Sequence, residues 1–229
     1  MTGEALKAAR KESKLTQQEV AAKLGLTQAY LSMIESGRRL VTEELAVKAV
    51  SLFRLPPTAL PLKVDPPHKL DERGFKAELA ALGFPGFAKF RRGKPKSNPA
   101  RLLLLALCQD DLDKRVVEAL PWLLVKYPDL DWQWVLMNAK VGDCQNRFGF
   151  VVDVAEDIAK MQRDPVQRER LSEMKALIER SRLAREDTLC ADSMKKAKRR
   201  SIRRTRPAKA RHWNLLTDME AKNLGYVWG

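Results

Sequence analysis

The sequence has few cysteines and histidines, two residue types that often carry catalysis or bind metal ions. Among its 229 residues are three cysteines, Cys108, Cys144 and Cys190, and two histidines, His68 and His212. The cysteines are widely spaced and form no CxxC pair, so we predict reduced thiols and neither a disulfide framework nor a zinc site. Motifs for nucleophilic catalysis, phosphate loops and dinucleotide binding are absent. We therefore predict neither an enzyme nor a bound cofactor or metal.

Long hydrophobic runs are absent as well. No apolar stretch approaches the roughly 20 residues of a membrane-spanning helix, and the charged start of the chain differs from a secretory signal peptide. We expect a cytoplasmic protein without membrane contact. Two proline-containing segments, RLPPTALPLK at 54–63 and VDPPHKLDER at 64–73, mark places where helices should end.

Positive charge, in contrast, is abundant and unevenly distributed. The formal net charge is +14, and the segment KKAKRRSIRRTRPAKAR at 195–211 has ten basic residues and no acidic one. Like charges at this density repel each other, so we expect a basic tail that stays extended until it meets an anion. Nucleic acid, an acidic protein surface or solubility alone would each explain such a tail.

The stretch TQQEVAAKLGLTQAYLSMIESG at 16–37 predicts two short helices around one glycine. Apolar residues recur at helical spacing on both sides of Gly25. Thr16 begins a capping box at the first helix, and Thr27 caps the second. Gly25 fits a left-handed helix end, and Ala21 is small enough for the two helices to cross closely. These features indicate a helix-turn-helix, and the alternative is a tight corner in a purely structural helical core.

The flanking sequence favours the helix-turn-helix. Helices are predicted over about 4–13 and within TEELAVKAVSLF at 42–53. Counted from Gln17, alanine, glycine, leucine and isoleucine occupy the fifth, ninth, fifteenth and eighteenth positions. With these residues, the stretch 3–62 resembles the N-terminal domain of lambda-repressor-like (Cro/C1, XRE) regulators. The resemblance implies DNA binding, with the helix at about 27–36 in the major groove and the preceding helix across the backbone.

The resemblance also implies which side chains meet double-stranded DNA. Gln28 can offer an amide to adenine and Ala29 a methyl contact to thymine. Ser32 and Met33 lie one turn further along, and these four are the predicted base-reading residues. Phosphate contacts are predicted for six residues with suitable charge or hydrogen-bonding groups: Gln17, Tyr30, Arg38, Arg39, Arg10 and Lys14. A solvated helix face without a ligand is the alternative for the base-reading set.

The chain departs from this family after Phe53, where a fifth helix often contributes to dimerisation. The prolines of 54–63 leave room for little helix there. A single domain with few base contacts binds DNA weakly, whereas a dimer reads two half-sites. If a homodimer forms, we therefore expect the rest of the chain to bring the two copies together.

Beyond 73 the pattern predicts helices and no strands. A short helix near 75–82 precedes GFPGFAKFRRGKPK at 83–96, which we expect to be an exposed loop. LLLLAL at 102–107 predicts a buried central helix. The remaining helices, with a kink at Pro121, are predicted at 113–126, 132–141, 145–161 and 164–183. Short loops between such helices favour an antiparallel bundle.

Aromatic residues raise the question of a protein partner. Trp122, Trp132 and Trp134 are close in sequence, and helical periodicity places at least one of them partly in solvent. They could pack in the core, or one of them could anchor a protein partner. The segment 212–229 is too apolar to remain in water, so it docks on the chain's own body or on another protein. The predicted partner-binding residues of the tail are Trp213, Leu216, Tyr226, Trp228, Arg199, Arg200, Arg203 and Arg204.

We therefore predict an all-α protein with four regions. A helix-turn-helix domain at 1–63 is followed by a linker at 64–73, a helical domain at 74–185 and a basic tail with an aromatic C-terminal segment at 186–229. The phrases NPARLLLLALCQDDLDKRVVEALPWLLVKYPDLDW and QNRFGFVVDVAEDIA resemble helix-turn-helix antitoxins encoded beside nucleotidyltransferase-like toxins, over about 98–161.

Three functions follow from these features. The antitoxin resemblance implies a DNA-binding repressor whose C-terminal region neutralises a cognate toxin and which autoregulates its operon. The second is a stand-alone phage- or host-type repressor whose C-terminal helices serve dimerisation or signal sensing. The third is an interaction protein that holds RNA or an acidic protein with its basic tail, without reading sequence.

Overall fold

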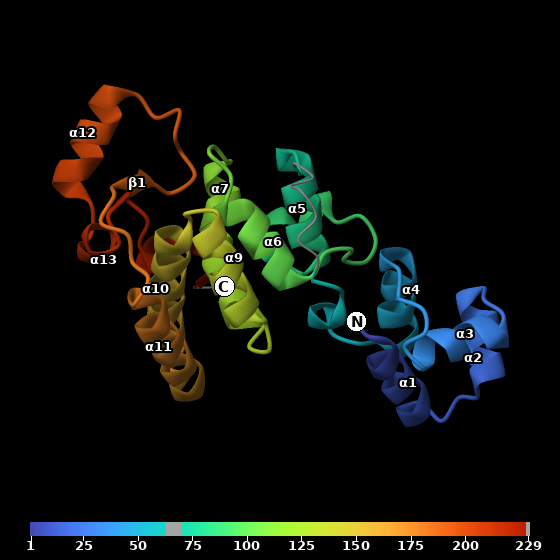
Figure 1. Cartoon of the computed structure of the whole chain (residues 1–229). Coiled ribbons are helices and arrows are strands. Elements are labelled where there is room, and N and C mark those ends of the chain that lie inside the picture. The colour runs from blue at the N-terminus through green and yellow to red at the C-terminus, as the bar shows by residue number, and fades with distance from the viewer. Residues whose placement is uncertain (63–69, 228–229) are drawn as a thin grey trace. The chain divides into compact units, whose positions relative to one another are not determined.

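The computed structural model describes residues 1–62 and 70–227 (Figure 1). The chain divides into two compact units, Met1–Asp65 with Gly93–Asn98 and Pro66–Arg92 with Pro99–Gly229. The described residues are mostly helical, which confirms the predicted fold class, and their only strands are two of two residues each. Within these residues no helix combines the length and apolar character needed to cross a membrane. His68 and most of the predicted linker lie outside the described residues.

The first unit is built from four short helices, drawn in blue in Figure 1: α1 (Gly3–Glu12), α2 (Gln17–Leu24), α3 (Gln28–Glu35) and α4 (Glu43–Phe53). A threonine caps each of them, because its hydroxyl accepts a hydrogen bond from a backbone N–H of the first turn. Apolar side chains at helical spacing, among them Leu6, Val20, Leu31 and Ile34, form one buried core. Local signals thus place all four helices.

The chain after α4 forms almost no helix, as its prolines predict. One 3-10 turn, η1 (Pro57–Ala59), is the only helical element between Phe53 and residue 62. An unpredicted segment, Gly93–Asn98, belongs to this unit. The side-chain amide of Asn98 donates hydrogen bonds to the carbonyls of Thr58 and Leu60, each at 2.8 Å. Part of the expected loop at 83–96 therefore completes the first unit.

The second unit surrounds one long helix, α10 (Gln145–Met161), in which thirteen of seventeen residues are buried. This makes α10 the central helix, although the LLLLAL helix α6 (Pro99–Leu107) is also largely buried. In Figure 1, α11 (Pro165–Glu179) runs beside α10. The other helical elements before α10 are α5 (Glu72–Ala81), η2 (Pro85–Phe90), α7 (Lys114–Glu118), α8 (Leu120–Lys126) and α9 (Trp132–Val141).

Three details differ from the predicted bundle. The helix predicted at 113–126 is divided into α7 and α8, because Pro121 occupies the first turn of a new helix instead of kinking a continuous one. The expected loop after α5 contains a 3-10 segment whose Phe87 is buried. Helix α11 ends four residues earlier than predicted, at Glu179. The three neighbouring tryptophans are all half-buried.

The prediction of an extended basic tail is wrong. Residues 187–227 form α12 (Lys196–Thr205), α13 (Ala208–His212), η3 (Ala221–Asn223) and η4 (Gly225–Val227). The absence of strands is also wrong, since β1 (Asp187–Thr188) and β2 (Leu215–Leu216) pair in parallel. Arg147 of α10 holds β1, because its guanidinium donates to both carboxylate oxygens of Asp187, at 2.8 and 3.0 Å.

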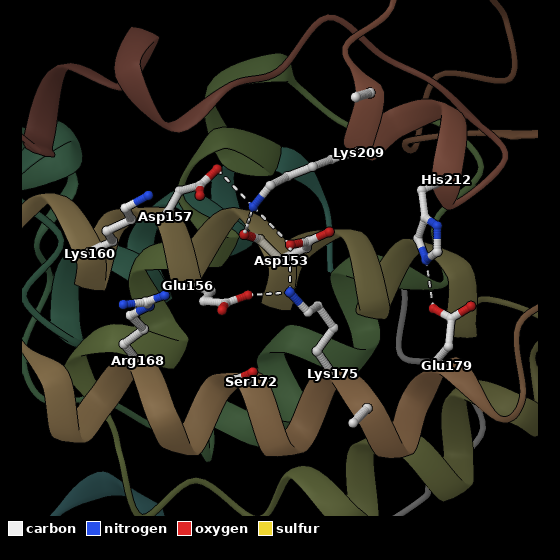
Figure 2. Close-up of a pocket in the computed structure, with 12 residues that line it drawn as sticks. Asp153, Glu156, Asp157, Lys160, Arg168, Ser172, Lys175, Glu179, Lys209 and His212 are labelled. Atoms are coloured by element: carbon white, nitrogen blue, oxygen red, sulfur yellow. Dashed lines mark hydrogen bonds and ion pairs between the residues drawn. The ribbon is translucent and has the colours of Figure 1, made fainter.

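A second buried anchor holds α13 and the residue after it. Figure 2 shows the carboxylate of Asp153, on α10, between the ammonium groups of Lys175 and Lys209. Their nitrogens lie 3.2 and 2.8 Å from the Oδ1 atom of Asp153, and the indole N–H of Trp213 donates to its Oδ2 at 3.1 Å. Burial raises the pKa of this carboxyl, but the hydrogen bond and charge of Lys209 outweigh it and hold the pKa below its ordinary value.

Trp213 fits its site because residue 149 is glycine. Trp213 is completely buried, and a Cβ added to Gly149 would lie 2.3 Å from two carbons of the indole ring. Leu216 is also buried, at 2% exposed. Trp213 and Leu216 are therefore core residues of this unit and are not available to a partner, which corrects their predicted role.

The other predicted tail contacts have mixed outcomes. Arg199 of α12 donates to the carbonyls of Met194 and Asp192 in the preceding loop, and Arg203 forms an ion pair with Glu186. Arg200 and Arg204 are exposed, and no interaction of their side chains is found within the described residues. Tyr226 is half-buried, and its hydroxyl donates to the carbonyl of Glu118 at 2.9 Å; Trp228 lies outside the described residues. Only some of the basic residues of 195–211 are thus paired within the protein.

We expect Asp153→Asn to release the C-terminal segment. The variant removes the buried carboxylate that Lys175 and Lys209 share and leaves them only Glu156 and Asp157, which should cost about 1–3 kcal/mol. Trypsin should then cut within 195–211 several times faster than in the parent protein, as peptide mapping would measure. Asp157→Asn is the matched control, because Asp157 is a more exposed partner of Lys209 alone. Equal cleavage rates in both variants would contradict the anchoring role of Asp153.

Candidate nucleic-acid interface

The turn between α2 and α3 is formed by Gly25. Its φ of 71° and ψ of 37° lie in the left-handed region, where a side chain would be strained. The N–H of Leu26 then donates back to the carbonyl of Ala21 at 2.8 Å. Ala21 is 2% exposed, and its small side chain lies in the buried core that α2 and α3 share. These observations confirm the turn that the sequence predicts.

A buried carboxylate at the end of α3 joins three helices of this unit. The side chain of Glu35 is 2% exposed. Its Oε1 accepts a hydrogen bond from Arg10 Nε at 2.7 Å, and its Oε2 accepts from Arg10 Nη2 and Gln17 Nε2, both at 2.9 Å. Arg10 belongs to α1 and Gln17 begins α2, so this cluster fixes α3 relative to both. We call these three residues the Glu35 cluster.

The Glu35 cluster keeps its charges at neutral pH. Burial alone would raise the pKa of Glu35, but the hydrogen bonds from Arg10 and Gln17 and the Arg10 charge hold that pKa below its usual range. The same pairing raises the pKa of Arg10. The carboxylate of Glu35 and the guanidinium of Arg10 therefore stabilise each other in their ionised forms.

The predicted base-reading face is open. Gln28, Ala29 and Ser32 are exposed on α3, and Met33 is half-buried. On the opposite side of the same helix, Leu31 and Ile34 are completely buried. Within the described residues the side chains of Gln28 and Ser32 form no hydrogen bond, so their polar atoms are free to meet base edges. The face is thus accessible, and contact of these four residues with DNA stays a prediction.

Among the predicted phosphate contacts, the charged residues around the reading helix are accessible. Lys14, Arg38 and Arg39 are exposed, and within the described residues none of them forms an ion pair. Tyr30 is half-buried and packs against the core. Lys14 has a positive φ of 55° in the loop before α2, so its side chain extends from a defined turn.

The prediction for Arg10 is wrong. Its guanidinium is committed to Glu35 and to the carbonyl of Leu15, and its side chain is 12% exposed. Arg10 therefore orients α3 and is not a phosphate contact. Gln17 uses one amide hydrogen on Glu35, which leaves its second amide hydrogen and the unpaired backbone N–H groups at the start of α2 for a phosphate.

Sequence reasoning did not identify Glu35 as a structural residue. The available signal is an acidic residue that directly follows the core position Ile34, where the helical pattern continues inward. Its partners, however, lie 25 and 18 residues earlier in the chain, so local periodicity gives no indication of the contact.

We expect Glu35→Gln to destabilise the first unit. Removing one charge of a buried pair should cost about 3 kcal/mol, because Arg10 then keeps an uncompensated charge. Backbone amide exchange of residues 3–35, followed by mass spectrometry in the full chain, should become correspondingly faster at neutral pH. Glu12→Gln, at an exposed position of α1, is the matched control and should change little.

The destabilisation caused by Glu35→Gln should depend on pH. Because the pKa of Glu35 is lower in the folded protein than its ordinary value of 4.5, its stabilising contribution is fully present above that pH and is lost as the pH falls. The difference between parent and Glu35→Gln should therefore shrink below pH 4.5. A difference that stays constant down to pH 3 would show that the charge of Glu35 is not responsible.

Comparison with known proteins agrees with this geometry. Residues 6–60 match the model of a helix-turn-helix family. No curated protein and no solved structure matches the chain. A DNA-binding domain acts in the compartment that holds the DNA, and this agrees with the cytoplasmic location that the sequence predicts. The N-terminal unit therefore carries a helix-turn-helix domain of the lambda-repressor-like (XRE) type, which supports a DNA-binding transcriptional regulator.

Proposed function

We propose that this regulator is an antitoxin: its first unit reads an operator, and its second unit binds and neutralises a cognate toxin, so that it represses its own operon. The observation that supports operator reading is the exposed face of α3, held in place by the Glu35 cluster and lined by free polar side chains. Neither unit is assigned a catalytic step, a cofactor or a membrane contact.

The antitoxin part is supported by the resemblance over about 98–161. These residues include α6 to α10 and thus supply the central helices of the second unit. The resemblance therefore concerns the second unit almost entirely and not the helix-turn-helix. A nucleotidyltransferase-like toxin is the partner that it implies.

The surface of the second unit offers a place for a protein partner. Trp134, Met137 and Val141 of α9 are spaced at i, i+3 and i+7, so they lie along one side of the helix. Met137 is 64% exposed and Val141 86% exposed, while Trp134 is half-buried. Neighbouring large apolar side chains in solvent mark interaction surfaces. We assign the toxin contact to this α9 stripe, because two of the predicted tail contacts are buried.

The same stripe leads to the second candidate function. If two copies of this chain meet along α9, the second unit is a dimerisation body and the protein is a stand-alone repressor. The exposed apolar side chains suit either occupant, since neither requires a polar pocket. Operator reading by two half-sites would benefit from a dimer in both cases.

We expect Gln28→Ala combined with Ser32→Ala to weaken operator binding. Each lost base contact should cost about 1–3 kcal/mol, whereas binding to unrelated DNA should stay the same because phosphate contacts remain. Fluorescence anisotropy with operator and scrambled duplexes at one salt concentration measures both. Gln133→Ala with Ser172→Ala, the same exchanges at exposed positions of the second unit, is the control. An equal loss on both duplexes would argue against the reading face.

We expect Met137→Asp combined with Val141→Asp to abolish toxin neutralisation and leave operator binding intact. Charges placed in the α9 stripe should prevent its burial against a partner. Growth rescue after co-expression with a nucleotidyltransferase-like toxin, to be sought in the adjacent reading frame, tests neutralisation. Val166→Asp, at a 77% exposed position of α11, is the matched control.

The result separates the two candidate functions. Loss of rescue with an unchanged sedimentation coefficient supports the toxin contact. Loss of self-association, in the absence of a neighbouring toxin, supports the stand-alone repressor. Full rescue by the double variant would refute the assignment of the α9 stripe.

A further inference from the structure

Two of the three cysteines meet beside the start of α10. Cys108 directly follows α6, and Cys144 directly precedes α10. Their sulfur atoms lie 2.7 Å apart, against about 2.05 Å in a disulfide bond. We propose that Cys108 and Cys144 are a peroxide-sensitive pair that forms a reversible intramolecular disulfide. This assignment does not depend on the proposed antitoxin role.

The two thiols differ in access. Cys108 is exposed, whereas Cys144 is 3% exposed. An oxidant in solution therefore reaches Cys108 first, and the sulfur of Cys144 lies behind it, 2.7 Å away. This is the arrangement of an attacking and a resolving cysteine, in which the second thiol captures the oxidised form of the first.

The surroundings favour the reactive form of Cys108. The hydrogen bond from Cys144 lowers the pKa of the Cys108 thiol, and the positive charge of Arg147 adds to this, although partial burial works against it. The thiolate is the nucleophile in thiol oxidation. The surroundings of the pair therefore favour oxidation at Cys108.

Gly142 leaves space over the sulfur atoms. A Cβ added at this position would lie 3.1 Å from the Sγ atom of Cys108 and 3.7 Å from that of Cys144. The φ of Gly142 is −94°, so alanine could take the same backbone conformation. A methyl group at 142 would therefore crowd the sulfur pair without straining the chain.

The third cysteine provides an internal comparison. Cys190 is 1% exposed, and its thiol donates to the carbonyl of Ala106 at 3.3 Å. Burial raises its pKa to about 12. Within the folded protein, Cys190 should therefore remain reduced while the pair is oxidised.

The reaction balances with hydrogen peroxide as the oxidant. The Cys108 thiolate attacks one peroxide oxygen, the O–O bond breaks, and after proton uptake the products are a sulfenic acid and one water. The Cys144 sulfur then attacks the Cys108 sulfur, the S–O bond breaks, and a second water leaves with the thiol proton. Overall, two thiols lose two electrons and the peroxide is reduced to two waters.

The disulfide would close a covalent loop that contains α7, α8 and α9. It joins the end of α6 to the start of α10, two residues beyond the C-cap of α9 at Gly142. Oxidation should therefore restrict the end of α9 that carries Val141. The thermal unfolding temperature of the oxidised chain should be higher than that of the reduced chain, because the unfolded state loses freedom.

The experiment treats the reduced full chain with hydrogen peroxide and follows each thiol by alkylation and peptide mass spectrometry. We expect a peptide pair joined through Cys108 and Cys144, free Cys190, and full recovery with dithiothreitol. Gly142→Ala should form the disulfide several times more slowly. Cys144→Ser should stop at a Cys108 sulfenic acid, which dimedone traps, and this variant keeps the proposal testable if Gly142→Ala changes the fold.

Three results would overturn the proposal. The first is a Cys108 sulfinic acid in the parent protein while Cys144 remains a free thiol. The second is a disulfide between Cys108 residues of two copies. The third is a Cys144 that reacts as fast in Cys108→Ser as in the parent, which would show that Cys108 is not the attacking thiol.

Discussion

The position of the reading helix depends on the paired charges of Glu35 and Arg10. A helix of eight residues is too short to be stable alone, so its orientation comes from tertiary contacts. Leu31 and Ile34 attach one side of α3 to the core, but apolar contacts alone allow small rotations. The directional hydrogen bonds of Glu35 to α1 and α2 remove this freedom, and they therefore determine where Gln28 and Ser32 point.

The second unit uses a buried carboxylate for a different purpose. A run of ten basic residues without an acidic one repels itself, and in isolation it would not fold. Asp153 changes this balance, because it neutralises Lys209 from the run and Lys175 from α11, and accepts the indole N–H of Trp213. The apolar end of the chain then contributes its own burial, with Trp213 against Gly149.

These contacts explain how far the sequence alone could predict the protein. Threonine caps, the turn at Gly25 and the exposed face of α3 are encoded within a few residues, and all of them are observed. The Asp153–Trp213 contact joins residues 60 positions apart, and its acid is only one residue within an apolar stripe. The prediction of an extended tail is wrong for this reason: repulsion within 195–211 predicts an extended chain, but Asp153, a distant residue, offsets it.

The two units expose different kinds of side chain. In the first unit, the polar side chains of Gln28 and Ser32 on α3 are exposed and unused within the described residues, as base reading would require. The second unit leaves apolar side chains of α9 in solvent, and these cannot read DNA but can be buried against a protein. The Cys108–Cys144 pair adjoins the end of that helix. A disulfide at the sulfur pair would therefore act first on the end of α9 that carries Val141, within the surface proposed for a protein partner.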